Sequence, residues 1–272
     1  NIILDWLFVI ELGMGTMGAA LATGAGVIFS TIIGLWYFLS GKSHVKFHKK
    51  YFKIDKKLLK DIFKIGFVSF MIQISIGVVI LVQNVILYQY GNTADIAIFC
   101  VTGYVISLYT QLCVGMSQGM QPLIGCHYGA NQIKRMHKLL QITLIASVMT
   151  SIVALLALIF YGEYFIRLYG IAENLLDLAY NRTIIFCLGI PFIGIVYTMG
   201  AYYQALNRNI EANIVSIGRS FVLQILFSLT LPIFMGVEGV FYAQPFSDIG
   251  SIFILIGVML YCHMKAKNKK VA

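Results

Sequence analysis

Charged side chains inside the apolar stretches of this chain are few, and two of them fall at matching depths. Arg219 lies nine residues into the stretch 210–235, and Asp248 lies ten residues into the stretch 238–263. Because an α-helix rises about 1.5 Å per residue, both side chains are expected roughly 13–15 Å from the ends where their helices start. A short turn joins the two stretches, so the helices are antiparallel neighbours and the arginine meets the carboxylate.

A buried Arg219–Asp248 ion pair of this kind could serve one of two roles. It could lock two helices together, or it could take part directly in the coupling of ion or substrate movement. The residue types and their depths leave both roles open.

The sequence contains no pattern that predicts a catalytic or nucleotide-binding site. The stretch Gly13-Met-Gly-Thr-Met-Gly18 matches the dinucleotide fingerprint G-x-G-x-x-G, which needs a preceding strand, a soluble helix and an acidic residue about 20 positions on. An uncharged apolar stretch follows instead, and the next acidic residue is Asp55. No nucleophile, base and orienting group gather at the end of any apolar stretch, so we predict no catalytic residue and no enzyme.

Cysteines and histidines also lack the spacing of a metal or redox site. The cysteines form no C-x-x-C pair, and we expect them to be small buried hydrophobes; they are Cys100, Cys113, Cys126, Cys187 and Cys262. His44 and His48 are one helical turn apart but stand among lysines with no carboxylate nearby. We predict no metal site, no disulfide and no cofactor.

The composition is that of an integral membrane protein. Hydrophobic residues make up 59% of the 272 residues and charged residues only 11%, which is more apolar surface than a soluble domain of this length can bury. The formal net charge is +9, but the basic residues form short clusters between apolar stretches and not one face of a domain. The lipid bilayer is therefore the expected partner, and nucleic acid is excluded.

Seven apolar stretches are long enough to cross the hydrocarbon core as helices, which takes roughly 20 residues. They are 14–40, 64–88, 95–124, 139–161, 181–205, 210–235 and 238–263. The links after the first, third, fifth and seventh stretches are basic, whereas the intervening links are neutral or acidic overall. Since basic links stay in the cytoplasm, we predict an all-α membrane protein whose C-terminus is cytoplasmic and whose first span enters from outside.

The stretch Gly115–Lys138 carries polar and helix-breaking residues of the kind that line a cavity. Glycines, glutamines and Pro122 precede a basic cluster, which indicates a broken membrane helix that faces water or protein instead of lipid. Close packing through small residues is the alternative interpretation. The candidate substrate-cavity residues, which could equally lie in helix interfaces, are Gln73, Asn84, Gln111, Gln118, Gln121 and Pro122.

An internal repeat relates the first stretch to the last. A shift of 221 positions aligns Gly15-x-x-Gly18 with Gly236-x-x-Gly239, each just before a span that enters from outside. Equivalent last helices of two six-helix repeats would give this spacing, and such repeats are common in transporters. Because the first residue is Asn1 and not Met, we expect the chain to be part of a longer protein.

Three groups of residues resemble the multidrug and toxic compound extrusion (MATE) transporters. Asn1–Asp5 followed by Leu12–Thr23 is similar to that family's junction between its fifth and sixth helices. Gly115-x-Ser-x-Gly-x-Gln-Pro122, followed by Tyr128-Gly-Ala130, resembles its signature in the second helix of the second lobe. Gly236-x-x-Gly239 and Gln244-Pro-x-x-Asp248 resemble its last helix.

The resemblance implies a twelve-helix antiporter with two six-helix lobes, which exports cationic or amphiphilic compounds in exchange for Na⁺ or H⁺. The chain would contain the last helix of the first lobe (1–41), a basic cytoplasmic linker (42–63), a complete second lobe (64–264) and a basic cytoplasmic tail (265–272). The first five helices would be missing, so the fragment alone should not transport. Its place would be a cell membrane, in bacteria the inner one.

The resemblance also bears on where the coupling ion binds. Family members couple through a carboxylate in the first helix of the first lobe, or through acidic residues in the first and fourth helices of the second. The corresponding stretches 64–88 and 181–205 have no acidic residue within their membrane cores, and Gln73 is only a neutral polar group. We therefore expect coupling in the missing half.

Two alternative functions stay open. Flippases of lipid-linked or polysaccharide precursors share the architecture, but they usually line their cavity with several cations, whereas Arg219 is nearly alone in this chain. A seven-helix receptor shares the outside-to-inside topology. Against the receptor stand the six-helix repeat and the lack of a core lysine in 238–263 for a retinal Schiff base. The pattern favours an exporter.

Overall fold

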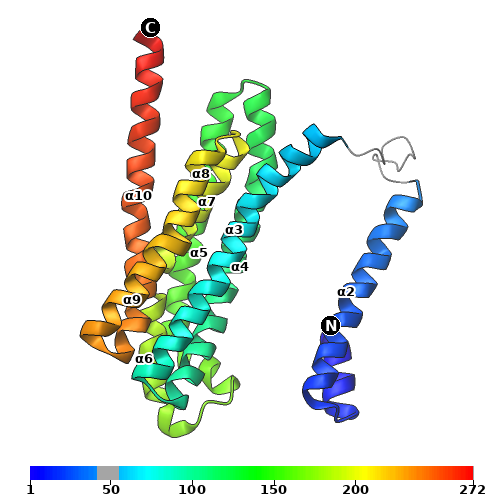
Figure 1. Cartoon of the computed structure of the whole chain (residues 1–272), viewed down its shortest axis with the longest axis vertical. Coiled ribbons are helices and arrows are strands. Elements are labelled where there is room, and N and C mark those ends of the chain that lie inside the picture. The colour runs from blue at the N-terminus through cyan, green and yellow to red at the C-terminus, as the bar shows by residue number, and fades with distance from the viewer. Residues whose placement is uncertain (42–54, 272) are drawn as a thin grey trace. The chain divides into compact units, whose positions relative to one another are not determined.

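The computed structural model describes residues 1–41 and 55–271, and the chain divides into two compact units, Asn1–Lys64 and Ile65–Ala272. Both units are drawn in Figure 1. Most of the predicted linker 42–63, including His44 and His48, lies outside the described residues.

The first unit is built around one long apolar helix. Its elements are α1 (Ile2–Asp5), the π-helical stretch η1 (Trp6–Glu11) and α2 (Gly15–Leu39). Gly13 and Gly15 have φ of +60° and +55°, a left-handed conformation that glycine adopts without steric cost. A Cβ on Gly18 would come within 2.9 Å of the Phe8 carbonyl oxygen. The G-x-G-x-x-G stretch therefore forms a tight turn and a close helix contact.

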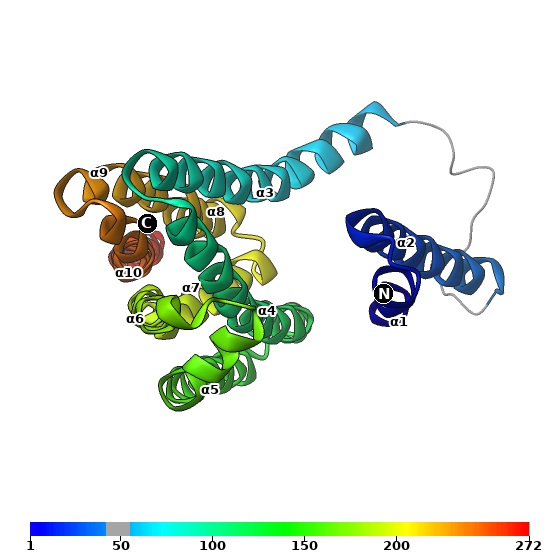
Figure 2. The same ribbon diagram turned by 90° about the horizontal axis from the view of Figure 1, so that it is seen from below.

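The second unit is a bundle of long helices joined by short turns (Figure 2). Along the chain the elements are α3 (Lys56–Tyr90), which starts within the first unit, α4 (Thr93–Gly129), α5 (Ile133–Leu168), η3 (Glu173–Leu175), α6 (Leu176–Cys187), α7 (Ile190–Ala205), α8 (Asn209–Ile217), η4 (Gly218–Leu223), α9 (Gln224–Met235) and α10 (Val237–Val271). Helices α6 and α7 form one span, and α8, η4 and α9 form another. With α2, the described residues contain seven helical segments long and apolar enough to cross a membrane, so the predicted seven-helix, all-α fold is confirmed.

The turns of the second unit alternate between two ends of the bundle (Figure 1). The turns that precede α4, α6 and α10 lie at one end, and those that precede α5 and α8 lie at the other. At this second end Asn131 and Asn207, with φ of 57° and 58°, follow the last turns of α4 and α7, where asparagine tolerates the left-handed conformation. The first turns of α4, α6 and α10 are thereby brought to the same depth.

Helix α4 runs from Thr93 to Gly129 without a break at Pro122. The predicted broken helix is therefore wrong here, because the proline removes one backbone donor while the helix continues on both sides of it. A Cβ on Gly115 or Gly119 would meet no atom within 4 Å, so this side of α4 is open in the described part of the chain. The interrupted span is instead the one formed by α6 and α7.

The core near the first turns of α4, α6 and α10 is aromatic. Phe99, Phe186 and Phe241 meet edge to face, with ring centroids 6.0 to 6.5 Å apart. Leu87 and Ile166 pack in the same cluster. Because lipid is as apolar as these side chains, close packing holds the helices together in a bilayer more than escape from water does.

Helix α10 continues past its membrane span, which ends at Cys262. The predicted basic tail 265–272 is therefore helical as far as Val271.

Candidate functional site

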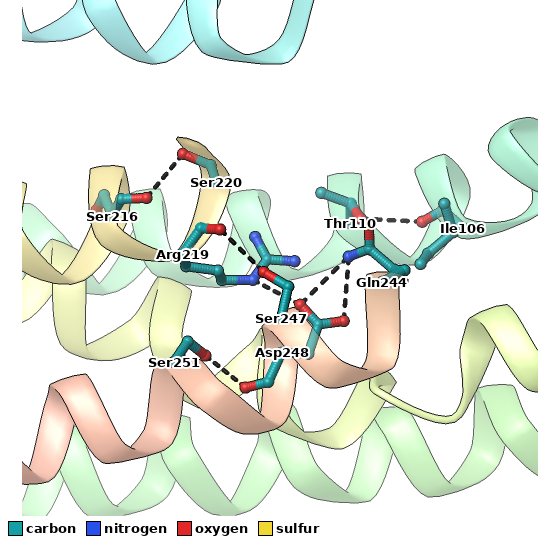
Figure 3. Close-up of polar contacts among 9 residues, drawn as sticks. All are labelled: Ile106, Thr110, Ser216, Arg219, Ser220, Gln244, Ser247, Asp248 and Ser251. Carbon is teal, nitrogen blue, oxygen red and sulfur yellow. Dashed lines mark hydrogen bonds and ion pairs between the residues drawn. The ribbon is translucent and has the colours of Figure 1, made fainter. Parts of the chain in front are cut away.

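Arg219 and Asp248 lie in contact inside the bundle, as Figure 3 shows. Arg219 Nε is 2.7 Å from Asp248 Oδ1, the distance of a charge-assisted hydrogen bond. The two side chains are 12% and 0% exposed. Asp248 belongs to α10, and Arg219 belongs to η4, the π-helical turn between α8 and α9. The turn between α9 and α10 brings these two elements side by side in antiparallel directions.

The Asp248 carboxylate has a further partner on its own helix, and a second hydrogen bond joins the two helices. Gln244 Nε2, one turn earlier on α10, donates to Oδ1 at 3.2 Å and to Oδ2 at 3.1 Å. Ser247 Oγ donates to the backbone oxygen of Arg219 at 3.0 Å, which adds a second link between the helices. A buried carboxylate is stable only when it is paired and hydrogen-bonded, and these contacts meet both conditions.

Arg219 stands on an irregular turn that faces a third span. A π-helical turn such as η4 widens the helix by one residue and often marks a functional position. The guanidinium carbon of Arg219 lies 5.5 Å from the centroid of the Tyr197 ring on α7, within the range of a cation–π contact. The arginine therefore contacts α10 through its charge and α7 through an aromatic face.

A second buried charge cluster, which the sequence analysis did not predict, lies where α4, α6 and α10 begin. Arg182 Nε and Nη2 lie 2.9 and 2.8 Å from Glu238 Oε1, and Arg182 Nη1 donates to Asp95 Oδ1. The side chains of Arg182 and Asp95 are 8% and 9% exposed, and that of Glu238 is 40% exposed. The Arg182 guanidinium also lies 5.0 Å from the centroid of the Phe241 ring. One arginine thus joins three helices.

Asp95 is held in place by the start of its own helix. Its backbone N–H donates to Asn92 Oδ1 at 3.1 Å, and its Oδ2 accepts from the Asn92 backbone N–H at 2.8 Å, which is a capping box. One carboxylate oxygen therefore caps α4 while the other binds Arg182.

A signal for this cluster is present in the sequence. Asp95, Arg182 and Glu238 are each the first or second residue of a predicted apolar stretch, and all three stretches are predicted to start at the same side of the membrane. Charges at the ends of links are common in membrane proteins, so the residue types alone do not predict the cluster. Their shared depth is the signal that indicates it.

The predicted cavity residues are spread over α3 and α4. Gln73, Gln111, Gln118 and Pro122 are exposed, while Asn84 and Gln121 are half-buried. Gln121 Nε2 is 3.5 Å from Gln204 Oε1 of α7, at the limit of a hydrogen bond. The assignment of these residues to a substrate cavity stays a prediction.

The cysteines only partly match their expected burial. Cys113 and Cys187 are buried, but Cys100 and Cys126 are exposed, so the prediction of burial is wrong for the latter two. Both lie on α4, where a small apolar side chain can face lipid. Among the residues that the structure describes, no group of three or more His, Cys, Asp and Glu could hold a metal ion.

Comparison with known proteins assigns the family. The model of the MatE family matches residues 67–230, which is more than half of the chain. The multidrug export proteins MepA of Staphylococcus saprophyticus and Staphylococcus aureus are 27% and 26% identical to the chain over 237 residues. Each match covers 85% of this chain and 52% of the relative, so the chain spans about half the length of these curated relatives.

Solved structures share the fold. The chain aligns, with a TM-score of 0.81 in each case, with outward-facing and inward-facing conformations of a multidrug resistance MATE family transporter of the MOP superfamily. The sequence identities are 19% and 20%, and the alignments cover 100% of this chain and 61% and 63% of the solved chains. The chain thus belongs to the MATE (MatE) family of multi-pass membrane transporters, which are not enzymes.

Proposed function

We propose that this chain is the second lobe, together with the last helix of the first lobe, of a secondary active antiporter. The complete protein would export cationic or amphiphilic organic compounds in exchange for Na⁺ or H⁺ by alternating access. The observation that carries the proposal is the match to the MatE family and to MepA exporters over about half of their length. The working unit would include five further helices before Asn1.

The Arg219–Asp248 pair has the features of a structural lock. Both carboxylate oxygens of Asp248 already accept hydrogen bonds, and the side chain is fully buried. A coupling carboxylate must release its partners to take up Na⁺ or H⁺, whereas a locking carboxylate keeps them. We therefore assign the pair to holding η4 against α10, and we place the coupling ion in the five preceding helices.

The open side of α4 supports a substrate cavity along this helix. Gln111, Gln118 and Pro122 are exposed on this helix, and the small residues Gly115 and Gly119 have free space beside them. Adaptable hydrogen-bonding side chains beside small residues suit organic compounds of varied shape. This side of α4 would face the substrate.

Orientation follows the charges of the links. Lys134 and Arg135 in the first turn of α5 and Arg208 just before α8 lie at one end of the bundle, whereas Glu173 and Asp177 lie at the opposite end. Basic links favour the cytoplasm, so the C-terminus would be cytoplasmic in the plasma membrane of a bacterium.

A flippase for lipid-linked precursors is less well supported. Pyrophosphate recognition calls for arginines or lysines whose charge is free to meet the ligand. Both buried arginines of the described spans are already paired with carboxylates: Arg182 with Asp95 and Glu238, and Arg219 with Asp248.

Transport by the complete protein tests the proposal. The protein would be reconstituted into liposomes with a fluorescent organic cation such as ethidium, and either a Na⁺ or a H⁺ gradient would be imposed. We expect exchange with one of the two gradients and none with residues 1–272 alone. No exchange with either gradient, together with translocation of a pyrophosphate-linked lipid, would contradict the exporter and favour the flippase.

A further inference from the structure

The span Glu173–Ala205 is interrupted inside the bundle. Helix α6 ends at Cys187 and α7 begins at Ile190, with Leu188 and Gly189 between them. Pro191 has no backbone N–H, so the carbonyl of Cys187, four residues earlier, loses its usual helical donor. Leu188 N–H bonds the Ile185 carbonyl at 3.2 Å, the tighter spacing of a 3₁₀ turn. The chain therefore changes its helical geometry at this point.

Gly189, at the interruption, contacts the Asp248 side chain. Gly189 is buried, and a Cβ built on it would lie 2.3 Å from Asp248 Oδ2 and 2.8 Å from Asp248 Cβ. Its φ of −75° and ψ of −9° are accessible to other residues. The glycine is therefore required for space and not for its backbone conformation, and the carboxylate occupies that space.

Gly189 is a third neighbour of the Asp248 carboxylate, beside Arg219 and Gln244. Arg219 binds Oδ1 and Gln244 binds both oxygens, as Figure 3 shows. Gly189 lies between the last residue of α6 and the first residue of α7, and it packs against Oδ2. The carboxylate is thus in contact with a cation on η4, an amide on α10 and a glycine at the α6–α7 break.

We propose that Gly189 is a positioning residue for the Asp248–Arg219 pair: the lack of a side chain at the α6–α7 break allows the carboxylate to reach the guanidinium. A larger residue at position 189 either displaces the carboxylate from Arg219 or pushes the α6–α7 span away from α10. The contact stands on its geometry, and only its consequence for export rests on the proposed function.

The test compares Gly189→Ala in two backgrounds of the full-length protein in detergent. In the wild type, overpacking by one Cβ is expected to lower the Tm by about 4 °C or more. In the background Arg219→Met with Asp248→Gly, the Asp248 atoms that the new Cβ would strike are gone. There the same substitution is expected to lower the Tm by less than about 2 °C.

Two other glycines provide matched controls. A Cβ on Gly162 would lie 2.9 Å from the Tyr180 ring, far in sequence from the pair, so Gly162→Ala should lower the Tm equally in both backgrounds. A Cβ on Gly103 would meet no atom within 4 Å, so Gly103→Ala should leave the Tm nearly unchanged in both.

The outcomes separate this inference from the proposed function. An equal loss of Tm for Gly189→Ala in both backgrounds overturns the inference. If the background protein does not fold, Arg219→Met with Asp248→Ala replaces it; the loss should then shrink only in part, because the 2.8 Å contact with Cβ stays. An unchanged loss again overturns the inference. A further outcome is that Gly189→Ala lowers the Tm less in the second background while the wild-type protein exports no organic cation. That combination supports the role of Gly189 and contradicts the exporter.

Discussion

Replacing Arg219 with methionine in the full-length protein is expected to destabilise it by about 3–5 kcal/mol, because the substitution leaves a buried carboxylate without its cation. Asp248 is fully buried and would keep the Gln244 amide as its hydrogen-bond donor. The free energy of unfolding, or the denaturant midpoint in detergent, is the quantity to measure.

The double substitution Arg219→Met with Asp248→Leu distinguishes a pair from two independent side chains. Removing both charges leaves no unpaired ion, so the double variant is expected to be more stable than either single variant. If its loss equals the sum of the two single losses, the pair contributes no coupling energy and the assigned lock is wrong.

Replacing Arg182 with methionine is expected to be at least as destabilising, by about 3–5 kcal/mol, because one guanidinium serves two carboxylates. Asp95 would be left buried, and Glu238, which Arg182 now holds near it, would repel it. The loss of stability is expected to include the start of α4, because Asp95 is part of the capping box of that helix. Thermal or denaturant unfolding in detergent measures the effect.

An exposed ion pair in the same bundle is the matched control. Arg167 and Glu173 are 3.7 Å apart with side chains 62% and 86% exposed, so Arg167→Met should cost only about 0–1 kcal/mol. Adding Asp95→Asn and Glu238→Gln to the Arg182 variant should restore part of the lost stability, since the repelling charges are then gone. A large loss at Arg167, or no recovery in the triple variant, contradicts the account of the cluster.

The spans and the contact between Arg219 and Asp248 could be predicted because a span, and a position along it, depend on fixed lengths. A membrane core of fixed thickness needs about 20 apolar residues, and a fixed rise per residue converts sequence position into depth. The structure then brings Arg219 Nε to 2.7 Å from Asp248 Oδ1.

Features that depend on contacts between distant helices could not be predicted in this way. A proline signals a weakened helix but not whether the helix breaks: α4 continues through Pro122, whereas the α6–α7 span is interrupted next to Pro191. The need for glycine at position 189 arises from Asp248, which is 59 residues away. The φ of Gly189, −75°, is accessible to other residues, so the backbone conformation does not indicate that need. Packing against a partner helix decides both cases.

We propose that the helices of this chain cross the membrane in alternating directions. Single cysteines would be placed in a cysteine-free full-length protein at Lys134 and Asn209, at one end of the bundle, and at Glu173 and Met235, at the other. In intact cells, a membrane-impermeant maleimide is predicted to label positions 173 and 235. Positions 134 and 209 are predicted to react only after the membrane has been permeabilised. Labelling of positions 134 and 173 from the same side would contradict the account.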